Sequence, residues 1–327
     1  MTTLVTGGNG WLPSHVVRQL ARAGKQVVSY DLMPPDAFLD AFLGSDRANV
    51  IFEQGDVTDR DALREVALRH KVSNIISAAA ITPRVDRERR EPERIVDVNL
   101  GGVINALEVA RTLPGFCRFV QVSSGAVYGE PRGESTRDED AAANSTNLYG
   151  ITKLAGERIA LRYGELFDLD VIAVRPSNVY GPMERVTPGY AGATELREML
   201  RIHFAGNAIQ VKSAEASYRD WTFVEDVAEG IVAALNVSPA PARKIFNLAA
   251  GQQYSVGEVL EQFRTNLQGL AWQVVPEEEA NYPVFDDKRQ PLVLIDRAAQ
   301  DLGWQPRTSL ADGMREYLRW IATNGPQ

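Results

Sequence analysis

The chain has 327 residues, of which 44% are hydrophobic and 24% charged, and its formal net charge is −8. Such a composition is ordinary for a globular protein of one large domain, or of one domain with a smaller lobe. The acidic balance argues against nucleic acid or an anionic membrane as a partner, and no apolar run approaches the ~20 residues of a membrane span. The only cysteine, Cys117, excludes an internal disulfide and is expected to be buried and inert. A strand that begins almost at residue 1 leaves no room for a signal peptide, so we expect a cytoplasmic protein.

The first elements in the chain are typical of a dinucleotide-binding unit. An apolar strand at 3–6 leads into the glycine turn 7–10, and helical periodicity follows over 11–23. In such a unit, backbone N–H groups and the helix N-terminus face a pyrophosphate. The next strand, 26–31, ends in Asp31, whose carboxylate can accept a hydrogen bond from a ribose 2′-hydroxyl and would repel a 2′-phosphate. The predicted cofactor is therefore NAD rather than NADP.

One residue of this turn departs from the usual pattern. Pro13 stands where the third glycine of such turns usually stands. Proline is sterically acceptable at the start of a helix. With Pro13 at this position, the sequence does not determine how closely the helix packs against the first strand.

Strands and helices continue to alternate as far as residue 175. Further strands are expected at 50–55, 74–77, 118–122 and 171–174. The alternation predicts an α/β fold with a doubly wound, mostly parallel sheet (a Rossmann fold) covered by helices on both faces. Asp56, directly after the strand at 50–55, could contact an adenine edge. Ala78 and Ala79, directly after the strand at 74–77, are small enough to let a cofactor approach closely.

Beyond residue 175 the pattern loosens. Helices are expected at 194–204, 224–235, 255–267 and 309–322, and short strands at 208–211, 219–223 and 244–248. We expect a NAD-binding domain over 1–175, which also receives later segments from about 219–248, and a smaller substrate lobe formed mainly by 176–327. A dense charge run at 84–94 is typical of a solvated helix face, with an anionic substrate as the alternative partner of Arg84. A long helix is expected over 95–113.

Tyr149 and Lys153 are the central pair of candidate catalytic residues. They are four residues apart in a segment with helical character, so their side chains lie on one face, one turn apart. A neighbouring cation favours the phenolate, and the pKa of Tyr149 is expected to fall from its usual value near ~10. The hydroxyl of Ser124 could hold a substrate oxygen beside the phenol. Together these groups suit the oxidation of a secondary alcohol or the reduction of a ketone.

Taken together, these motifs resemble the extended short-chain dehydrogenase/reductase family, the NAD-dependent epimerase/dehydratase group. The matching segments, in family order, are 6–10, Asp31, 55–57, Asn99, 123–129, Tyr149 with Lys153, 175–182, 219–228 and 302–304. The resemblance implies a seven-stranded NAD-binding domain, a C-terminal substrate lobe, and a homodimer formed by helices near 92–112 and 146–166. It implies that Tyr149 is the general acid/base and Lys153 its pKa partner and a ribose ligand. Ser124 would bind the reacting oxygen, and Asn99 would support the lysine.

Two sets of candidate residues result. The predicted cofactor-binding residues are Gly7, Gly10, Trp11, Leu12, Asp31, Asp56, Val57, Ala78, Ala79, Asn99, Tyr149, Lys153, Pro176 and Val179. The predicted substrate-binding residues are Arg84, Ser124, Asn178, Arg219 and Arg289. With three histidines and one cysteine, no metal site is expected.

The resemblance also narrows the reaction. Family dehydratases need an acid pair in the serine loop, where this chain has Gly125 and Ala126, and no histidine or cysteine is placed for inversion at carbons 3 and 5. The segments 212–218 and 287–291 depart from the nucleotide-sugar pattern. Arg219 and Arg289 could therefore clamp a diphosphate, hold the carboxylate of a sugar acid, or form ion pairs within the protein.

Three hypotheses follow. The first is a nucleotide-sugar epimerase of the 4-epimerase type with tightly bound NAD. The second is a NAD-dependent dehydrogenase that acts on a free sugar, sugar acid or polyol and releases NADH. The third is a non-catalytic NAD-binding module, against which the intact Ser124, Tyr149 and Lys153 argue.

Overall fold

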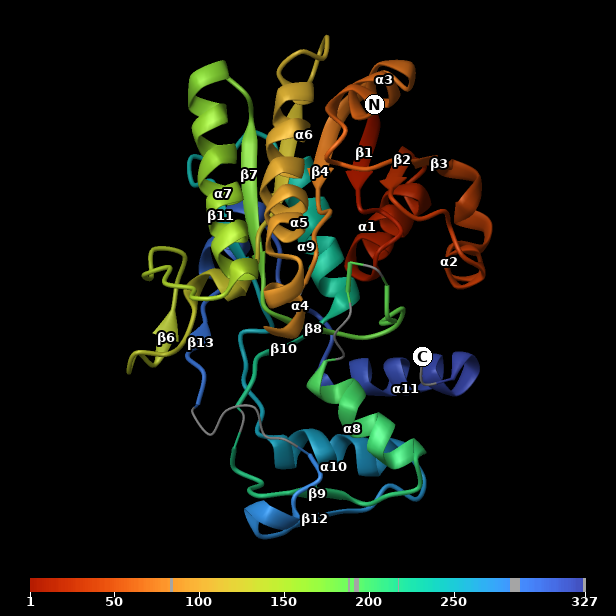
Figure 1. The fold of residues 1–327 in the computed structure, drawn as a ribbon, viewed down its shortest axis with the longest axis vertical. Helices are drawn as coiled ribbons and strands as arrows, with labels where there is room; N and C mark the ends of the chain where they lie inside the picture. The colour runs from red at the N-terminus through yellow and green to blue at the C-terminus, as the bar shows by residue number, and fades with distance from the viewer. Residues whose placement is uncertain (83–84, 188, 191–193, 217, 283–288, 326–327) are drawn as a thin grey trace.

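A parallel sheet of seven strands forms the centre of the protein (Figure 1). The computed structural model describes residues 1–82, 85–187, 189–190, 194–216, 218–282 and 289–325. In sheet order the strands are β11 (Ile245–Leu248), β7 (Val171–Pro176), β5 (Arg118–Val122), β4 (Val72–Ser77), β1 (Thr2–Thr6), β2 (Gln26–Asp31) and β3 (Val50–Gln54), and every neighbouring pair is parallel. The predicted doubly wound parallel fold is confirmed.

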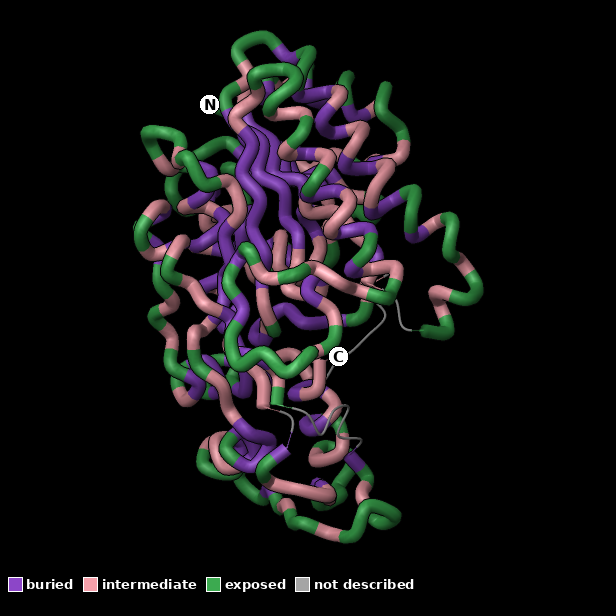
Figure 2. Tube along the Cα trace, turned by 90° about the vertical axis from the view of Figure 1, so that its left-hand side faces the viewer, coloured by how far each residue is buried: buried purple, intermediate pink, exposed green. Residues whose placement is uncertain are grey.

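Helices cover both faces of this sheet. One face carries α1 (Trp11–Arg22), α2 (Ala37–Leu43) and α9 (Val224–Asn236), and the other carries α3 (Arg60–Arg69), α5 (Pro92–Val96), α6 (Gly102–Ala110) and α7 (Leu148–Phe167). Successive residues of β1 divide between the two layers: Val5 packs in the cluster with α1 and α9, and Leu4 in the cluster with α3 and α6. This alternation follows from the two-residue period of a strand. Apart from the edge strand β3, the strands of this sheet are buried along most of their length (Figure 2).

The last third of the chain forms a second, smaller core below the sheet in Figure 1. Its elements are α8 (Glu195–Phe204), β9 (Ile209–Val211), α10 (Val256–Asn266), β12 (Trp272–Val274) and α11 (Leu310–Asn324). Three two-stranded sheets accompany it: β9 with β12, β8 (Asn178–Tyr180) with β10 (Trp221–Phe223), and β6 (Thr136–Arg137) with β13 (Leu292–Val293). Since β11 and α9 belong to the large sheet and its cover, the chain passes between the two cores more than once.

Two expectations from the sequence were wrong in detail. The helix expected over 95–113 is divided into α5, a π-helical turn, η2 (Asp97–Gly101), and α6. Cys117 is exposed rather than buried, because it lies in the turn before β5 and not in the strand itself. No helix among the described residues is both long and apolar enough to span a membrane.

Candidate active site

A cavity of about 700 Å³ lies at the carboxyl ends of the sheet strands, where ligands bind in open parallel sheets. Most of the predicted site residues line it: Gly7, Gly10, Trp11, Leu12, Asp31, Asp56, Val57, Ala78, Ala79, Ser124, Tyr149, Lys153, Pro176, Asn178 and Val179. Asn99, Arg219 and Arg289 are not among its lining residues. Arg84 lies outside the described residues.

The glycine turn between β1 and α1 is shaped by close backbone contacts. Gly7 has a φ of 68°, and a Cβ placed there would lie 2.8 Å from Cα of Ala79. A Cβ on Gly8 would lie 2.3 Å from Oγ of Ser29, so this glycine brings the turn against β2. Pro13 sits in the first turn of α1, where it is tolerated. Gly10 precedes α1 without a side-chain cap, which leaves backbone N–H groups of the first turn available to an anionic ligand.

Asp31 holds the backbone beside this turn. Its carboxylate accepts hydrogen bonds from the backbone N–H of Asn9 at 3.1 Å and of Met33 at 3.0 Å. Burial raises the pKa of Asp31, although these hydrogen bonds oppose the shift. Asp31 thus lines the cavity at the end of β2 and also organises the loop beside the glycine turn.

Asp56 is engaged by its neighbours in a similar way. Its carboxylate accepts hydrogen bonds from the backbone of Thr58 at 2.9 Å and from Nη2 of Arg94 at 2.6 Å. Burial acts to raise the pKa of Asp56, but these hydrogen bonds outweigh it and the pKa is lowered. Asp56 therefore carries a negative charge at this end of the cavity.

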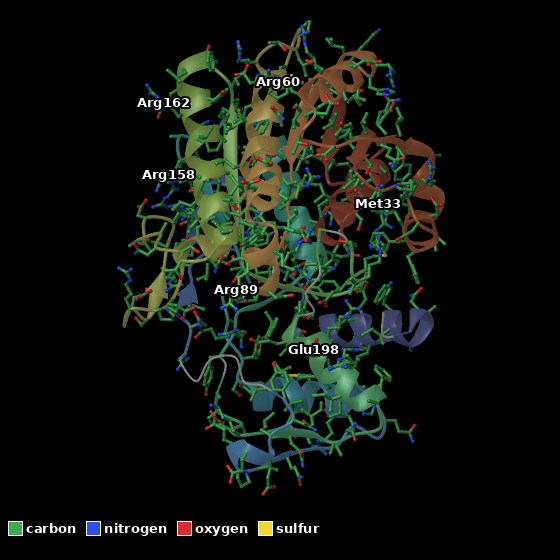
Figure 3. All side chains as sticks on the ribbon, viewed as in Figure 1. Met33, Arg60, Arg89, Arg158, Arg162 and Glu198 are labelled. Carbon is green, nitrogen blue, oxygen red and sulfur yellow. The ribbon has the colours of Figure 1, made fainter. Side chains whose placement is uncertain are left out.

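Tyr149, Lys153 and Ser124 come together as the sequence predicts. Asn147 caps α7 by accepting a hydrogen bond from the backbone N–H of Gly150 at 2.8 Å, which places Tyr149 and Lys153 in the first two turns. Ser124 caps the short helix η3 (Gly125–Tyr128), with its Oγ accepting the N–H of Ala126 at 3.1 Å. The outward side of α7 carries Arg158 and Arg162, which point away from the sheet (Figure 3).

The electrostatics of Tyr149 differ from the expectation. Burial raises its pKa, and its hydrogen bonds with the side chains of Ser124 and Thr82 oppose this only in part. Burial lowers the pKa of Lys153 to about 8. The lysine Nζ lies 5.8 Å from the centroid of the phenol ring. The expected fall in the pKa of Tyr149 is wrong for this structure, because burial of the phenol raises the pKa.

Thr82 is a residue of the site that the sequence analysis missed. Its side chain hydrogen-bonds with Tyr149, and its backbone pairs with the segment around Tyr190. It follows the small residues Ala78 and Ala79 after β4, where a lone hydroxyl gave no signal in the sequence.

Asn99 contributes from behind the cavity wall. From η2 its side-chain amide accepts from the N–H of Ile81 at 2.6 Å, donates to the carbonyl of Ile81 at 2.9 Å, and donates to Oγ1 of Thr152 at 3.2 Å. Thr152 is the neighbour of Lys153. The buried amide therefore ties the end of β4 to α7, and in this structure it makes no hydrogen bond to the lysine itself.

Two of the three arginines predicted to bind substrate, Arg219 and Arg289, are not among the residues that line the cavity. Arg219 forms an ion pair with Glu195 at 3.1 Å, and Glu195 lines the cavity. Arg289 is exposed, donates to Oε1 of Gln253 at 3.2 Å, and lies over the ring of Tyr218. Of the alternatives for Arg219, the ion pair within the protein is the one present here.

Comparison with known proteins gives the family. Residues 3–249 match the model of the NAD dependent epimerase/dehydratase family. The chain belongs to this family. Its relatives include a UDP-glucose 4-epimerase of Mycolicibacterium smegmatis, which is 32% identical over 324 residues covering 98% of both chains.

Solved structures of the family superpose over nearly the whole chain. A UDP-glucose-4-epimerase from Stenotrophomonas maltophila, with bound NAD and formylated UDP-arabinopyranose, has a TM-score of 0.84 and 25% identity and covers 99% of this chain and 98% of its own. A UDP-glucuronic acid 4-epimerase from Bacillus cereus, in complex with UDP-glucuronic acid and NAD, has a TM-score of 0.82 at 22% identity, covering 99% and 100%. The second likeness concerns the fold alone.

Proposed function

We propose that this protein is a nucleotide-sugar epimerase of the 4-epimerase type, which keeps its NAD bound through turnover. The observation that carries the proposal is the convergence of Ser124, Tyr149 and Lys153 on one cavity at the carboxyl edge of a Rossmann sheet. The similarity to a UDP-glucose 4-epimerase across 98% of the chain supports the choice of reaction.

The cofactor side of the cavity fits NAD. The N-terminus of α1 has no side-chain cap and can receive a diphosphate, while Asp31 at the end of β2 can accept hydrogen bonds from ribose hydroxyls. A dinucleotide held there would supply a reversible hydride acceptor for the carbinol carbon of the substrate. Gly7 and Gly10 would hold the diphosphate end, with Lys153 at the nicotinamide end.

The side chains of this protein handle the proton. Tyr149 would take the proton of the substrate hydroxyl as the carbon is oxidised and return it when the ketone is reduced. Ser124 would donate a hydrogen bond to the reacting oxygen and hold it beside the phenol. Lys153, a buried cation one turn away, would favour the phenolate at the moment of proton transfer. Inversion requires that the keto-sugar present its other face before the hydride returns.

One observation favours a second function, a dehydrogenase of a free sugar, sugar acid or polyol that releases NADH. Neither Arg219 nor Arg289 lines the cavity, and Arg219 is paired with Glu195, so no diphosphate clamp is formed by these two residues. A substrate without a diphosphate would not need one.

A single assay distinguishes the two functions. The protein is incubated with NAD and, separately, with UDP-hexoses, free sugars and sugar acids, while NADH absorbance and isomer composition are followed. Exchange between 4-epimers without accumulation of NADH supports the epimerase. Formation of stoichiometric NADH with a free sugar or sugar acid would refute the epimerase and support the dehydrogenase.

We also propose that the protein forms a homodimer through the helices near 92–112 and 146–166, which are α5, η2 and α6 in the first range and α7 in the second, as the family resemblance implies. Apolar side chains are exposed along this side, among them Val96, Ile151 and Leu166. Sedimentation velocity should give twice the chain mass of 36.0 kDa. A monomer at micromolar concentration would refute the proposal.

A further inference from the structure

Residues 182–187 with 189–190, here called the strap, cross the cofactor side of the cavity. The carbonyl oxygen of Pro182 accepts hydrogen bonds from Nε1 of Trp11 at 2.8 Å and from Nε2 of His15 at 3.1 Å. The ring of Tyr190 lies 5.6 Å from that of Trp11. The strap is thus attached directly to the helix that begins at the glycine turn.

Arg185 is the charged attachment of the strap. Its Nη2 donates to the carbonyl oxygen of Asn9, inside the glycine turn, at 3.1 Å, and its Nε donates to Oδ2 of Asp36 at 3.0 Å. The side chain is 8% exposed and lines the cavity, where it interacts electrostatically with Asp31. The planar guanidinium is thus held in a fixed geometry by one buried partner, Asn9, and one exposed partner, Asp36.

The neighbouring residue attaches the strap to the other lobe. Glu184 is buried and accepts hydrogen bonds from the hydroxyl of Tyr317 in α11 at 2.7 Å and from the backbone of Thr194 at 2.8 Å. It also accepts from the hydroxyl of Tyr190 at 3.2 Å. Two adjacent side chains of opposite charge therefore reach in opposite directions, Glu184 to the substrate lobe and Arg185 to the cofactor turn.

We propose that Arg185 is a positioning residue that fastens the strap across the cofactor side of the cavity and thereby slows the release of NAD. The inference rests on the proposed function, since an epimerase must return the hydride before its cofactor leaves. Release requires the strap to move away from Asn9 and Asp36, and interactions lost on opening act mainly on the dissociation rate. Glu184, directly before Arg185, attaches the same part of the strap to the substrate lobe, and the contacts of Arg185 must break before the strap can leave the glycine turn.

The test measures NAD release directly. Protein loaded with radiolabelled NAD is chased with excess unlabelled NAD, and retained label is followed by filtration, without any sugar present. We expect Arg185→Ala to release NAD at least about tenfold faster than the wild type, with Arg185→Lys intermediate because it keeps the charge and loses the fork. The apparent KM for NAD should rise by more than kcat changes.

A matched control and a second variant complete the design. Arg47→Ala removes an exposed arginine that pairs with Asp40 at 3.0 Å in the same domain, and it should leave NAD release unchanged. Asp36→Asn removes the charge that faces Arg185 but keeps an oxygen for the N–H of Leu39 at the start of α2, so it also decides the question if Arg185→Ala fails to fold. Asp36→Asn should accelerate the release of NAD, as Arg185→Ala does.

Release rates within twofold of the wild type in Arg185→Lys and Asp36→Asn would overturn the proposal. The outcome is independent of the reaction catalysed. Faster release in a protein that proves to be a dehydrogenase would leave the role of Arg185 intact while the proposed epimerase failed. Unchanged NAD release in the variants of an active epimerase would refute the role of Arg185 and leave the proposed function intact.

Discussion

The ammonium of Lys153 donates a hydrogen bond to the carbonyl oxygen of Val122 at 2.9 Å, so the lysine is fixed to the end of β5. Its Nζ remains 5.8 Å from the centroid of the Tyr149 ring. The lysine can therefore act on the phenol through its charge without a direct hydrogen bond. Burial lowers the pKa of Lys153 to about 8, so this charge is itself sensitive to pH near neutrality.

The first prediction concerns the alkaline limb of the rate profile. Lys153 has a pKa of about 8. Below that pH its ammonium is protonated and favours the phenolate of Tyr149, and above that pH the positive charge is lost. We expect kcat to decline above about pH 8, by up to about tenfold per pH unit. Lys153→Arg keeps its charge at all accessible pH values and should lower kcat but remove this limb. A limb at the same pH in Lys153→Arg would show that another group titrates there.

Tyr149→Phe tests the acid/base itself. Removal of a general acid/base costs about 10²–10⁴-fold in rate, so turnover should nearly vanish. NAD should bind as in the wild type, because the glycine turn and Asp31 are untouched, and equilibrium dialysis can check this. Activity within about tenfold of the wild type would rule out Tyr149 as the proton carrier.

Asp31→Asn tests the choice of cofactor. The variant keeps one carbonyl oxygen at the end of β2 but loses the charge that repels a 2′-phosphate. We expect the ratio of the dissociation constants for NADP and NAD to fall at least about tenfold. Asp46→Asn, at an exposed ion pair with Arg22, is the matched control. An unchanged ratio would show that residues other than Asp31 distinguish the ribose 2′-hydroxyl from a 2′-phosphate.

The sequence predicted the sheet well because each strand is short, apolar and followed by a turn signal. The predicted strands also located the cavity, because parallel strands bring their carboxyl ends to one edge of the sheet, and Asp31, Asp56 and Ser124 lie at those ends. Tyr149 and Lys153 could be paired because a four-residue spacing on a helix is local information.

What the sequence could not supply depends on contacts between distant segments. Asn99 was expected to support Lys153, yet its amide binds Ile81 and Thr152, and only the fold places it there. The direction of the pKa shift of Tyr149 depends on burial, which spacing alone does not report. The sequence indicated no element or role for the strap, although Arg185 hydrogen-bonds to Asn9, a residue 176 positions earlier in the chain.

Asp220 provides a case in which burial of a charge should be measurable as stability. Its side chain is 2% exposed, and Oδ1 accepts hydrogen bonds from Thr222 at 3.0 Å and from the backbone of Ala250 at 2.8 Å. Burial raises the pKa of Asp220 from 3.8 to about 6, because these hydrogen bonds do not offset the desolvation of the carboxylate.

The last prediction concerns how the free energy of unfolding depends on pH through the ionisation of buried Asp220. A folded-state pKa above the unfolded one means that the stabilising contribution is present below pH 3.8 and is lost as the pH rises through about 6. The ionised carboxylate then costs about 3 kcal/mol, from about 1.36 kcal/mol per pKa unit. Because Asp220→Asn cannot ionise, the free energy of unfolding of the wild type should fall by most of that amount relative to the variant between pH 4 and about pH 7. Urea unfolding of both proteins at four pH values measures the difference, and parallel curves would show that Asp220 does not titrate in this range.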